Sequence, residues 1–322
     1  MWPKAIETDL LRVEHVLCRE LSSSDGMLGD MSRHVLSAGG KRLRPSLVIL
    51  SARACAEDPD EHNLADVAAS TEIIHMATLV HDDVVDGAET RHGCTTANTI
   101  WGNHLSVLMG DHMFTKGLSL LSDHRNTVAL RILICAASAM VRGEVSQIEH
   151  RGDLSIPVSA YLEIIRGKTA EFMSACCRIG AVLGCAPPAH QERMVSYGLN
   201  LGMAFQITDD ILDIIGDPDL TGKTTGNDIR DGKVTLPLIL ALERVGKEQK
   251  ALLSGVLRNR NAATSEIDLI REMVSDCGAI EASRDIARRY VESALEALDG
   301  VNASTVRNSL SELVRHIPSR TR

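Results

Sequence analysis

The acidic stretch Met76-Ala-Thr-Leu-Val-His-Asp-Asp-Val-Val-Asp86 returns later in the chain as Met203-Ala-Phe-Gln-Ile-Thr-Asp-Asp-Ile-Leu-Asp213. Each copy places Asp-Asp-x-x-Asp inside an apolar run of helical length. On a helix, positions i and i+4 share a face, so Asp82 and Asp86 point the same way and Asp83 lies on the neighbouring row. The second copy repeats this arrangement with Asp209, Asp213 and Asp210.

Carboxylates on an otherwise apolar face are costly unless a cation neutralises them. Hard divalent cations suit them best, and Mg²⁺ typically binds through one or two carboxylates together with substrate phosphates. A single such triplet is weak evidence, because a solvated helix face has the same pattern. Two copies of the same spacing in apolar surroundings favour a pair of metal-binding helix ends.

The composition indicates a soluble helical protein. Of the 322 residues, 44% are hydrophobic and only 2% are aromatic, so the core must consist of aliphatic side chains, which suit packed helices. The net charge of −9 argues against nucleic acid as a partner. The eight cysteines form no Cys-x-x-Cys pair, which is typical of buried thiols in a reducing cytosol. With no signal-peptide pattern and no apolar run of transmembrane length, we expect a cytoplasmic protein without stable membrane insertion.

Apolar periodicity and stop signals predict an all-α fold with ten or more helices, in a single domain over residues 1–322. Both acidic motifs close long predicted helices, and polar, basic loops follow them at 87–98 and 217–233. The predicted helices span 4–21, a segment ending near Leu36 after a break at 22–26, 45–56, 63–86, 99–121, 126–150, 158–185, 189–216, 234–245, 247–257, 265–277, 279–298 and 302–315.

Basic residues cluster in short motifs around the two acidic stretches. Gly39-Gly-Lys-Arg-Leu-Arg-Pro45 opens a helix, where free backbone N–H groups favour anions. Further basic groups lie in Arg91-His-Gly93, in Gly167-Lys-Thr169 and at Lys223 and Lys233. None has the spacing of a phosphate-binding P-loop. Each motif alone is typical of a solvated surface, but the set predicts two diphosphate sites, one bridged by metal and one held by Lys and Arg.

At these residues the sequence resembles the trans (all-E) polyprenyl diphosphate synthases. The shared motifs are Gly-Gly-Lys-x-x-Arg-Pro, Asp-Asp-Val-Val-Asp, Gly-Lys-Thr, Phe-Gln-x-x-Asp-Asp-x-x-Asp and Gly-Asn-Asp-x-x-x-Gly-Lys-Val-Thr-Leu-Pro, in family order between about residues 39 and 237. The resemblance implies the isoprenoid synthase fold, a helical bundle around a central cavity. It also implies a homodimer that adds isopentenyl diphosphate head-to-tail to an allylic diphosphate, either farnesyl or geranylgeranyl diphosphate.

The resemblance further implies a role for each motif residue. Mg²⁺, three ions per active site, would bridge the allylic diphosphate to Asp82, Asp86 and Asp209, with Asp83, Asp210 and Asp213 in support. The allylic diphosphate itself would be held by Arg91, Lys168 and Lys233, with Lys223 close by. Isopentenyl diphosphate would be held by Lys41, Arg44 and His75. The reacting carbons would lie beside Gln206 and Thr169.

The chain departs from the family at one position. The family usually has Arg-Arg-Gly where this chain has Arg91-His92-Gly93, and the second Arg normally helps to bind isopentenyl diphosphate. Because His92 is only partly charged at neutral pH, we expect weaker binding of isopentenyl diphosphate with some pH dependence.

The residues below the first motif predict product length. Thr78 and Ala77 lie four and five positions before Asp82, about 6–7.5 Å down the helix axis. Short-chain members of the family resemble one another in placing a bulky aromatic residue there as a floor. Small residues can also serve tight helix packing, but here they favour a deep tunnel with Ile74 a turn lower and with Met113 and Phe114 as deeper plugs. The expected product has roughly six to ten isoprene units, a length that fits quinone side chains.

Three alternatives remain open. A geranylgeranyl or farnesyl diphosphate synthase would share every motif and differ in tunnel depth. A class I terpene cyclase would share Mg²⁺ and one acidic motif, but it has no need of a second diphosphate site. A subunit of a heteromeric prenyl synthase would need a partner for turnover.

Overall fold

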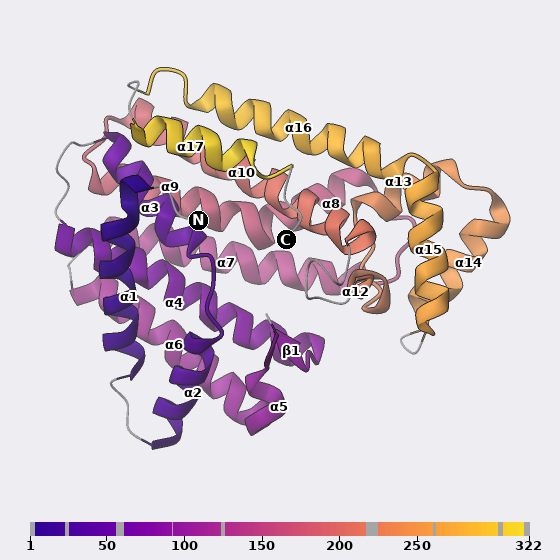
Figure 1. The fold of residues 1–322 in the computed structure, drawn as a ribbon, viewed down its shortest axis with the longest axis horizontal. Helices are drawn as coiled ribbons and strands as arrows, with labels where there is room; N and C mark the ends of the chain where they lie inside the picture. The colour runs from indigo at the N-terminus through magenta and orange to yellow at the C-terminus, as the bar shows by residue number, and fades with distance from the viewer. Residues whose placement is uncertain are drawn as a thin grey trace. The chain divides into compact units, whose positions relative to one another are not determined.

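The computed structural model describes residues 4–22, 26–55, 61–91, 93–123, 126–216, 225–259, 262–301 and 305–318. These residues are helical almost throughout, which confirms the all-α prediction (Figure 1). They form two compact units. Residues 1–135, 175–195 and 300–310 belong to the first unit, and residues 136–174, 196–299 and 311–322 belong to the second.

The first unit is built around α4 (Glu61–Asp86), the helix that carries the first acidic motif. Helix α4 packs against α6 (Asn103–Asp123), α1 (Glu7–Ser22) and α3 (Leu43–Cys55), as Figure 1 shows. The approach to α6 is close, because a Cβ at Gly117 would lie 2.7 Å from Cγ1 of Ile74. The remaining elements are η1 (Lys4–Ile6), α2 (Gly26–Ser37), β1 (Thr90–Arg91), β2 (Cys94–Thr95) and α5 (Ala97–Trp101).

Four helices contribute residues to both units: α7 (Thr127–Glu149), α9 (Glu171–Leu183), α10 (Pro188–Ile215) and α17 (Thr305–Arg315). The second acidic motif closes α10, as predicted. No helix in the described ranges is both long and apolar enough to span a bilayer.

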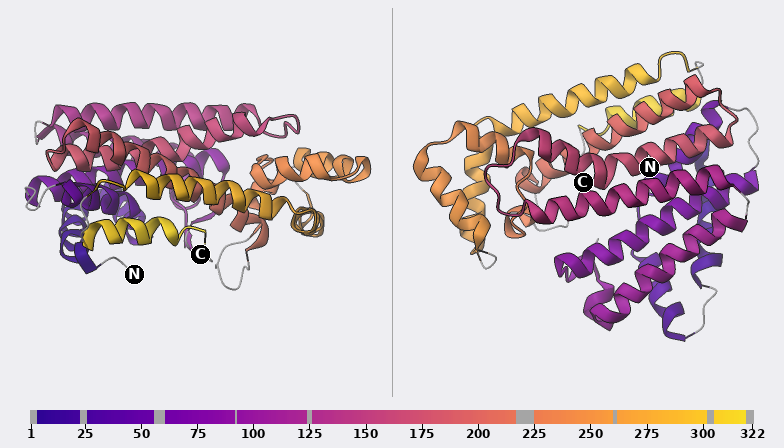
Figure 2. Two further views of the ribbon diagram at one scale, coloured as in Figure 1. Left: turned by 90° about the horizontal axis from the view of Figure 1, so that it is seen from above. Right: turned by 180° about the vertical axis from the view of Figure 1, so that it is seen from behind.

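The second unit contains α8 (Val158–Ile165), a π-helical turn η2 (Arg166–Ala170), α12 (Asn227–Arg230), α13 (Leu236–Arg244), α14 (Lys247–Arg258), α15 (Thr264–Asp276) and α16 (Ala279–Ala297). Helix α13 packs against α15 and α16, and α14 packs against α15 (orange in Figure 2). Their shared core is aliphatic, and it includes the fully buried Leu236, Leu238 and Ile270.

Two local predictions were wrong. The helix expected over 99–121 is two helices, because Gly102 adopts φ 81°, a left-handed conformation that favours glycine. The loop expected over 87–98 contains a two-stranded ladder in which Thr90 pairs with Thr95 and Arg91 with Cys94. Strands of two residues are too short to show an alternating pattern in sequence.

Candidate active site

The first acidic motif lies on the last turn of α4. Asp82 and Asp86 are half-buried, whereas Asp83 is buried. The chain leaves the helix through Gly87 at φ 64°, and the Ala88 amide donates to the Asp83 carbonyl at 2.9 Å. Asp82 and Asp86 thus differ from Asp83 in exposure, which fits their positions on neighbouring rows of the helix.

Asp83 is paired with Arg91 from strand β1. Its Oδ1 accepts a hydrogen bond from Nε of Arg91 at 2.8 Å, and Nη2 of Arg91 lies 2.7 Å from the same oxygen in the ion pair. Burial raises the pKa of Asp83, and the charge of Arg91 opposes that shift. The side chain of Asp83 is only 8% exposed, so this carboxylate serves first as an anchor for the arginine.

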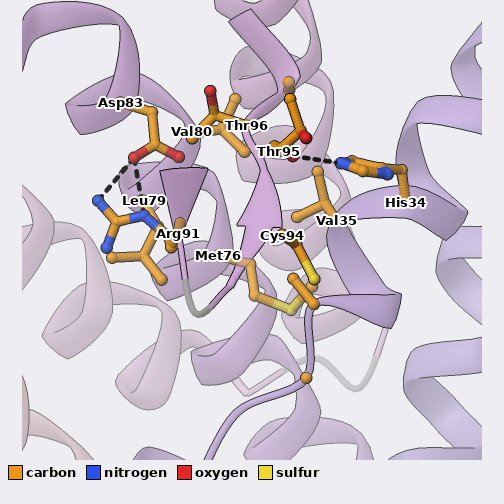
Figure 3. A pocket seen from close by; sticks show the side chains of 13 residues that line it. His34, Val35, Met76, Leu79, Val80, Asp83, Arg91, Cys94, Thr95 and Thr96 are labelled. Carbon is orange, nitrogen blue, oxygen red and sulfur yellow. Dashed lines mark hydrogen bonds and ion pairs between the residues drawn. The ribbon is translucent and has the colours of Figure 1, made fainter. Parts of the chain in front are cut away.

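The ladder that carries Arg91 is anchored to its unit at several points. The His34 ring nitrogen Nε2 lies 2.8 Å from the Thr95 carbonyl oxygen, and the His34 ring meets Trp101 edge-on at 5.2 Å. Figure 3 shows His34, Thr95, Arg91 and Asp83 around a small cavity of about 50 Å³ whose other walls include Met76. The position of Arg91 is thus set by tertiary contacts as well as by its ion pair.

The expected isopentenyl diphosphate residues belong to this same unit. Lys41 is exposed just before α3, Arg44 is half-buried in its first turn, and His75 is half-buried on α4. Gly39 and Gly40 both have positive φ, at 72° and 159°, which lets the chain turn tightly before Lys41. Burial lowers the pKa of Arg44, and the nearby carboxylate of Glu72 opposes that change.

In the second unit, Asp210 is the centre of a hydrogen-bond network. Its Oδ2 accepts from the Tyr161 hydroxyl at 2.6 Å, and its Oδ1 accepts from Nε2 of Gln206 at 2.8 Å. Oε1 of Gln206 in turn accepts from the Thr169 hydroxyl at 2.7 Å. The sequence-predicted Thr169, Gln206 and Asp210 therefore meet, and Tyr161 completes their network.

The carboxylates around Asp210 repel one another. Burial raises the pKa of Asp210 to about 7, and the charges of Asp209 and Asp213 add to the rise. Asp213 accepts hydrogen bonds from the backbone amides of Asn227 at 3.1 Å and Asp228 at 3.0 Å. Burial also raises the pKa of Asp228, and Asp213 contributes to that rise. Such a cluster favours binding of a cation.

Lys168 lies in the π-helical turn η2 between α8 and α9. Its ammonium donates to Oε1 of Gln147 at 2.7 Å and forms an ion pair with Glu144, both on α7. The two segments approach closely, because a Cβ at Gly143 would lie 2.5 Å from the Lys168 amide nitrogen. Within the helix predicted over 158–185, the Gly-Lys-Thr segment thus forms a π turn, a feature often found at functional sites.

The remaining predicted residues have varied settings. Lys233 forms an ion pair with Asp231 at 3.0 Å. His92 and Lys223 lie outside the described residues. The expected tunnel-wall residues Ile74, Ala77 and Met113 are fully buried, and Thr78 and Phe114 are half-buried.

The acidic residues fit a hard divalent cation that is completed by substrate. Among the described residues, no three His, Cys, Asp or Glu side chains converge closely enough to hold an ion alone. Mg²⁺ needs only one or two carboxylates when phosphates supply the other oxygen ligands. The half-buried Asp82, Asp86 and Asp209 suit that role better than Asp83 and Asp210, which are buried.

Several contributing residues were not predicted from the sequence: Glu72, Glu144, Gln147, Tyr161 and Asp228. Glu72 and Glu144 are isolated acids in their helices, whereas a repeated triplet pointed to the aspartates. Tyr161 offered no comparable signal, since a tyrosine in an apolar helix is usually a core residue.

Comparisons with known proteins agree over nearly the whole chain. The profile of the polyprenyl synthetase family matches residues 25–274. The heptaprenyl diphosphate synthase component 2 of Geobacillus stearothermophilus is 38% identical over 317 residues, covering 98% of this chain and 97% of that protein. The all-trans-nonaprenyl-diphosphate synthase (geranyl-diphosphate specific) of Rhodobacter capsulatus is 35% identical over 310 residues, covering 96% and 94%. The crystal structure of a Caulobacter crescentus polyprenyl synthase, complexed with calcium and isoprenyl diphosphate, matches with a TM-score of 0.95 and 37% identity over 99% and 97% of the two chains.

Proposed function

Because this chain belongs to the polyprenyl synthetase family, and is therefore a prenyltransferase, we propose that it lengthens an allylic diphosphate by all-trans, head-to-tail addition of isopentenyl diphosphate. The observation that supports the proposal is a pattern of burial and hydrogen bonding that both acidic motifs share. In each motif the second aspartate is buried and hydrogen-bonded, at Asp83 and Asp210, while the first aspartate is half-buried. Two acidic motifs of this kind can bind divalent cations, which stabilise a diphosphate as it leaves the substrate.

The basic residues are proposed to hold the allylic diphosphate. Arg91, Lys168 and Lys233 each pair with a carboxylate of the protein, at Asp83, Glu144 and Asp231. Charges that are already oriented lose little freedom when they contact a developing anion, so they stabilise the leaving group as its C–O bond breaks. Lys223 is proposed to assist them, and Lys41, Arg44, His75 and His92 are proposed to hold isopentenyl diphosphate.

The hydrogen-bond network orients the polar groups near the reacting carbons. Nε2 of Gln206 donates to Asp210, so Oε1 of Gln206 faces Thr169 and keeps a lone pair for positive charge on the allylic carbons. The double bond of isopentenyl diphosphate attacks that cation and forms the new C–C bond. A proton leaves the neighbouring carbon for the departing diphosphate, which restores a double bond in the product.

Mg²⁺ is the proposed cofactor, with three ions per active site. Asp82, Asp86 and Asp209 would hold it, and Asp83, Asp210 and Asp213 would support those ligands. When bound, Mg²⁺ supplies Lewis-acid stabilisation of the leaving diphosphate. The calcium in the Caulobacter crescentus structure supports a divalent cation in this family.

The proposed product is a polyprenyl diphosphate of medium or long chain, consistent with quinone side chains. The names of the heptaprenyl and nonaprenyl synthases support this length, as do the small or aliphatic residues Ala77, Thr78 and Ile74 on α4. A geranylgeranyl or farnesyl diphosphate synthase is the alternative, and product length distinguishes it. The family match does not favour a terpene cyclase.

We propose a cytoplasmic homodimer in which residues 1–322 act as one domain. A family profile that runs through both units supports the single domain. One face of α7 supports the dimer, because it carries Ile134, Val141, Val145 and Ile148, each at least 42% exposed. Two relatives named component 2, from Geobacillus stearothermophilus and Bacillus subtilis, support the alternative of a heteromer.

The direct test uses purified protein with Mg²⁺, farnesyl diphosphate and labelled isopentenyl diphosphate. We expect label in a lipid product, loss of incorporation in EDTA and recovery with added Mg²⁺. Asp209→Asn should lower incorporation by at least about 100-fold, since it removes a proposed metal ligand. No incorporation with either farnesyl or geranylgeranyl diphosphate would contradict a self-sufficient enzyme.

A further inference from the structure

Glu72 is a buried carboxylate on α4 that the proposed reaction does not use. The residue is 4% exposed, and its Oε1 accepts a hydrogen bond from Nη1 of Arg42 at 3.2 Å. No described residue donates a hydrogen bond to its buried Oε2. A buried carboxylate oxygen without a donor costs stability, so Glu72 does more in this protein than pack α4.

Arg42 is held between two helices by two carboxylates. Its Nε donates to Oε1 of Glu14 on α1 at 2.6 Å, while Nη1 donates to Glu72 on α4. Its backbone adopts φ 50°, which is unusual for a residue other than glycine. Gly40 lets the side chain pass, since a Cβ there would lie 3.1 Å from Nη1 of Arg42. The basic turn before α3 is thus fastened to α4 through Glu72.

The charge of Glu72 also acts on Arg44, which lies two residues after Arg42 in the sequence. Burial lowers the pKa of Arg44, and the attraction of Glu72 is the main effect opposing it. A guanidinium taken out of water needs a counter-charge to stay ionised and in place. Glu72 also shares a helical face with His75, three residues later, which belongs to the same proposed subsite.

We propose that Glu72 is a positioning residue for isopentenyl diphosphate: it fastens the basic turn through Arg42 and supplies the buried counter-charge for Arg44. This inference rests on the proposed function, which assigns Arg44 to that substrate. Glu72 itself does not touch the diphosphate, since two negative groups in contact would repel each other. Its removal should therefore affect one substrate and spare the other.

The test is Glu72→Gln, which keeps the shape of the side chain and removes its charge. We expect the KM for isopentenyl diphosphate to rise about tenfold, with the KM for farnesyl diphosphate within about twofold of wild type. Calorimetric titration of isopentenyl diphosphate alone should show the same weakening. An unchanged KM and unchanged binding would overturn the inference.

Glu14→Gln is the matched control, because Glu14 contacts the same Arg42, whereas Glu72 is the carboxylate whose charge opposes the pKa shift of Arg44. Its KM for isopentenyl diphosphate should stay within about threefold of wild type. If Glu14→Gln and Glu72→Gln raised the KM for isopentenyl diphosphate equally, Glu72 would act only through Arg42. That result would contradict its proposed role as the counter-charge of Arg44.

Glu72→Asp separates charge from folding. This variant keeps the negative charge, so its KM for isopentenyl diphosphate should lie well below that of Glu72→Gln. If Glu72→Gln does not fold, the KM of Glu72→Asp is compared with that of the wild type and should lie close to it. A KM raised about tenfold in Glu72→Asp would overturn the proposal. If the wild-type protein has no activity, the proposed function is wrong. The role of Glu72 is then tested by calorimetric titration of isopentenyl diphosphate into the wild-type protein and Glu72→Gln.

Discussion

At the scale of single residues, neighbouring aspartates of one motif differ in burial and contacts, and we propose that they differ in task. Asp83 accepts a hydrogen bond from Arg91 and forms an ion pair with it, and Asp210 accepts hydrogen bonds from Tyr161 and Gln206. Asp82 and Asp209 are half-buried. The family resemblance implied that all six aspartates bind or support metal, but a motif cannot tell a ligand from an anchor, because contacts such as that of Tyr161 with Asp210, 49 residues apart, form only in the folded chain.

The Mg²⁺ requirement tests this division in the first motif. Asp82→Asn should raise the Mg²⁺ concentration for half-maximal activity by about tenfold, since a ligand is lost. Asp83→Asn should raise that concentration less than Asp82→Asn does and should mainly raise the KM for the allylic diphosphate, because Arg91 loses its anchor. Activity titrations with Mg²⁺ measure both. Equal shifts in the two variants would make Asp83 a ligand.

Tyr161 tests the second motif. Tyr161→Phe leaves the buried Oδ2 of Asp210 without its hydroxyl donor, which should cost about 1–3 kcal/mol of stability. Because Gln206 depends on Asp210, kcat should also fall by about fivefold or more. Thermal unfolding and steady-state kinetics provide the two readings. A destabilised variant with wild-type kcat would confine Tyr161 to a structural role.

At the scale of helices, most of the architecture could be predicted because apolar periodicity and Gly or Pro breaks are local signals. The prediction of a helix over 63–86, for example, agrees with α4 at Glu61–Asp86. The break at Gly102, the short β1–β2 ladder and the form of the π turn at Lys168 could not be predicted. Each depends on tertiary contacts, such as the approach of η2 to Gly143.

The contact between η2 and α7 gives a prediction about glycine. Gly143→Ala should abolish most activity and destabilise the protein by about 2 kcal/mol or more, because its Cβ would lie 2.5 Å from the Lys168 amide. Gly255→Ala on α14 is the matched control, since its Cβ would meet nothing within 4 Å. That change should be neutral or slightly stabilising. Wild-type activity in Gly143→Ala would contradict this prediction, because the enzyme would then work although Lys168 is displaced.

The α4 wall gives a prediction about product length. Ala77 is fully buried on the helix that carries Asp82, and Ala77→Phe should shorten the product to farnesyl or geranylgeranyl diphosphate. Reversed-phase separation of the products measures the change, with thermal unfolding as the check on folding. A folded variant with the wild-type product distribution would remove Ala77 from the tunnel wall.

At the scale of the whole molecule, the exposed apolar face of α7 predicts self-association. Ile134→Glu should dissociate the dimer, because it places a charge among side chains that a partner would bury. Leu269→Glu on α15 is the control, since Leu269 is 49% exposed and Ile134 is 47% exposed. Light scattering after size exclusion gives the mass of each. A wild-type monomer, or a dimer that survives Ile134→Glu, would contradict this interface.

Product length tests the central claim most directly. Purified wild-type protein is incubated with Mg²⁺, farnesyl diphosphate and excess labelled isopentenyl diphosphate, and the dephosphorylated products are separated by reversed-phase chromatography. We predict a ladder that ends at roughly six isoprene units or more, because small and aliphatic side chains line α4 below Asp82. A product that stops at geranylgeranyl diphosphate would contradict the claim of a medium- or long-chain synthase.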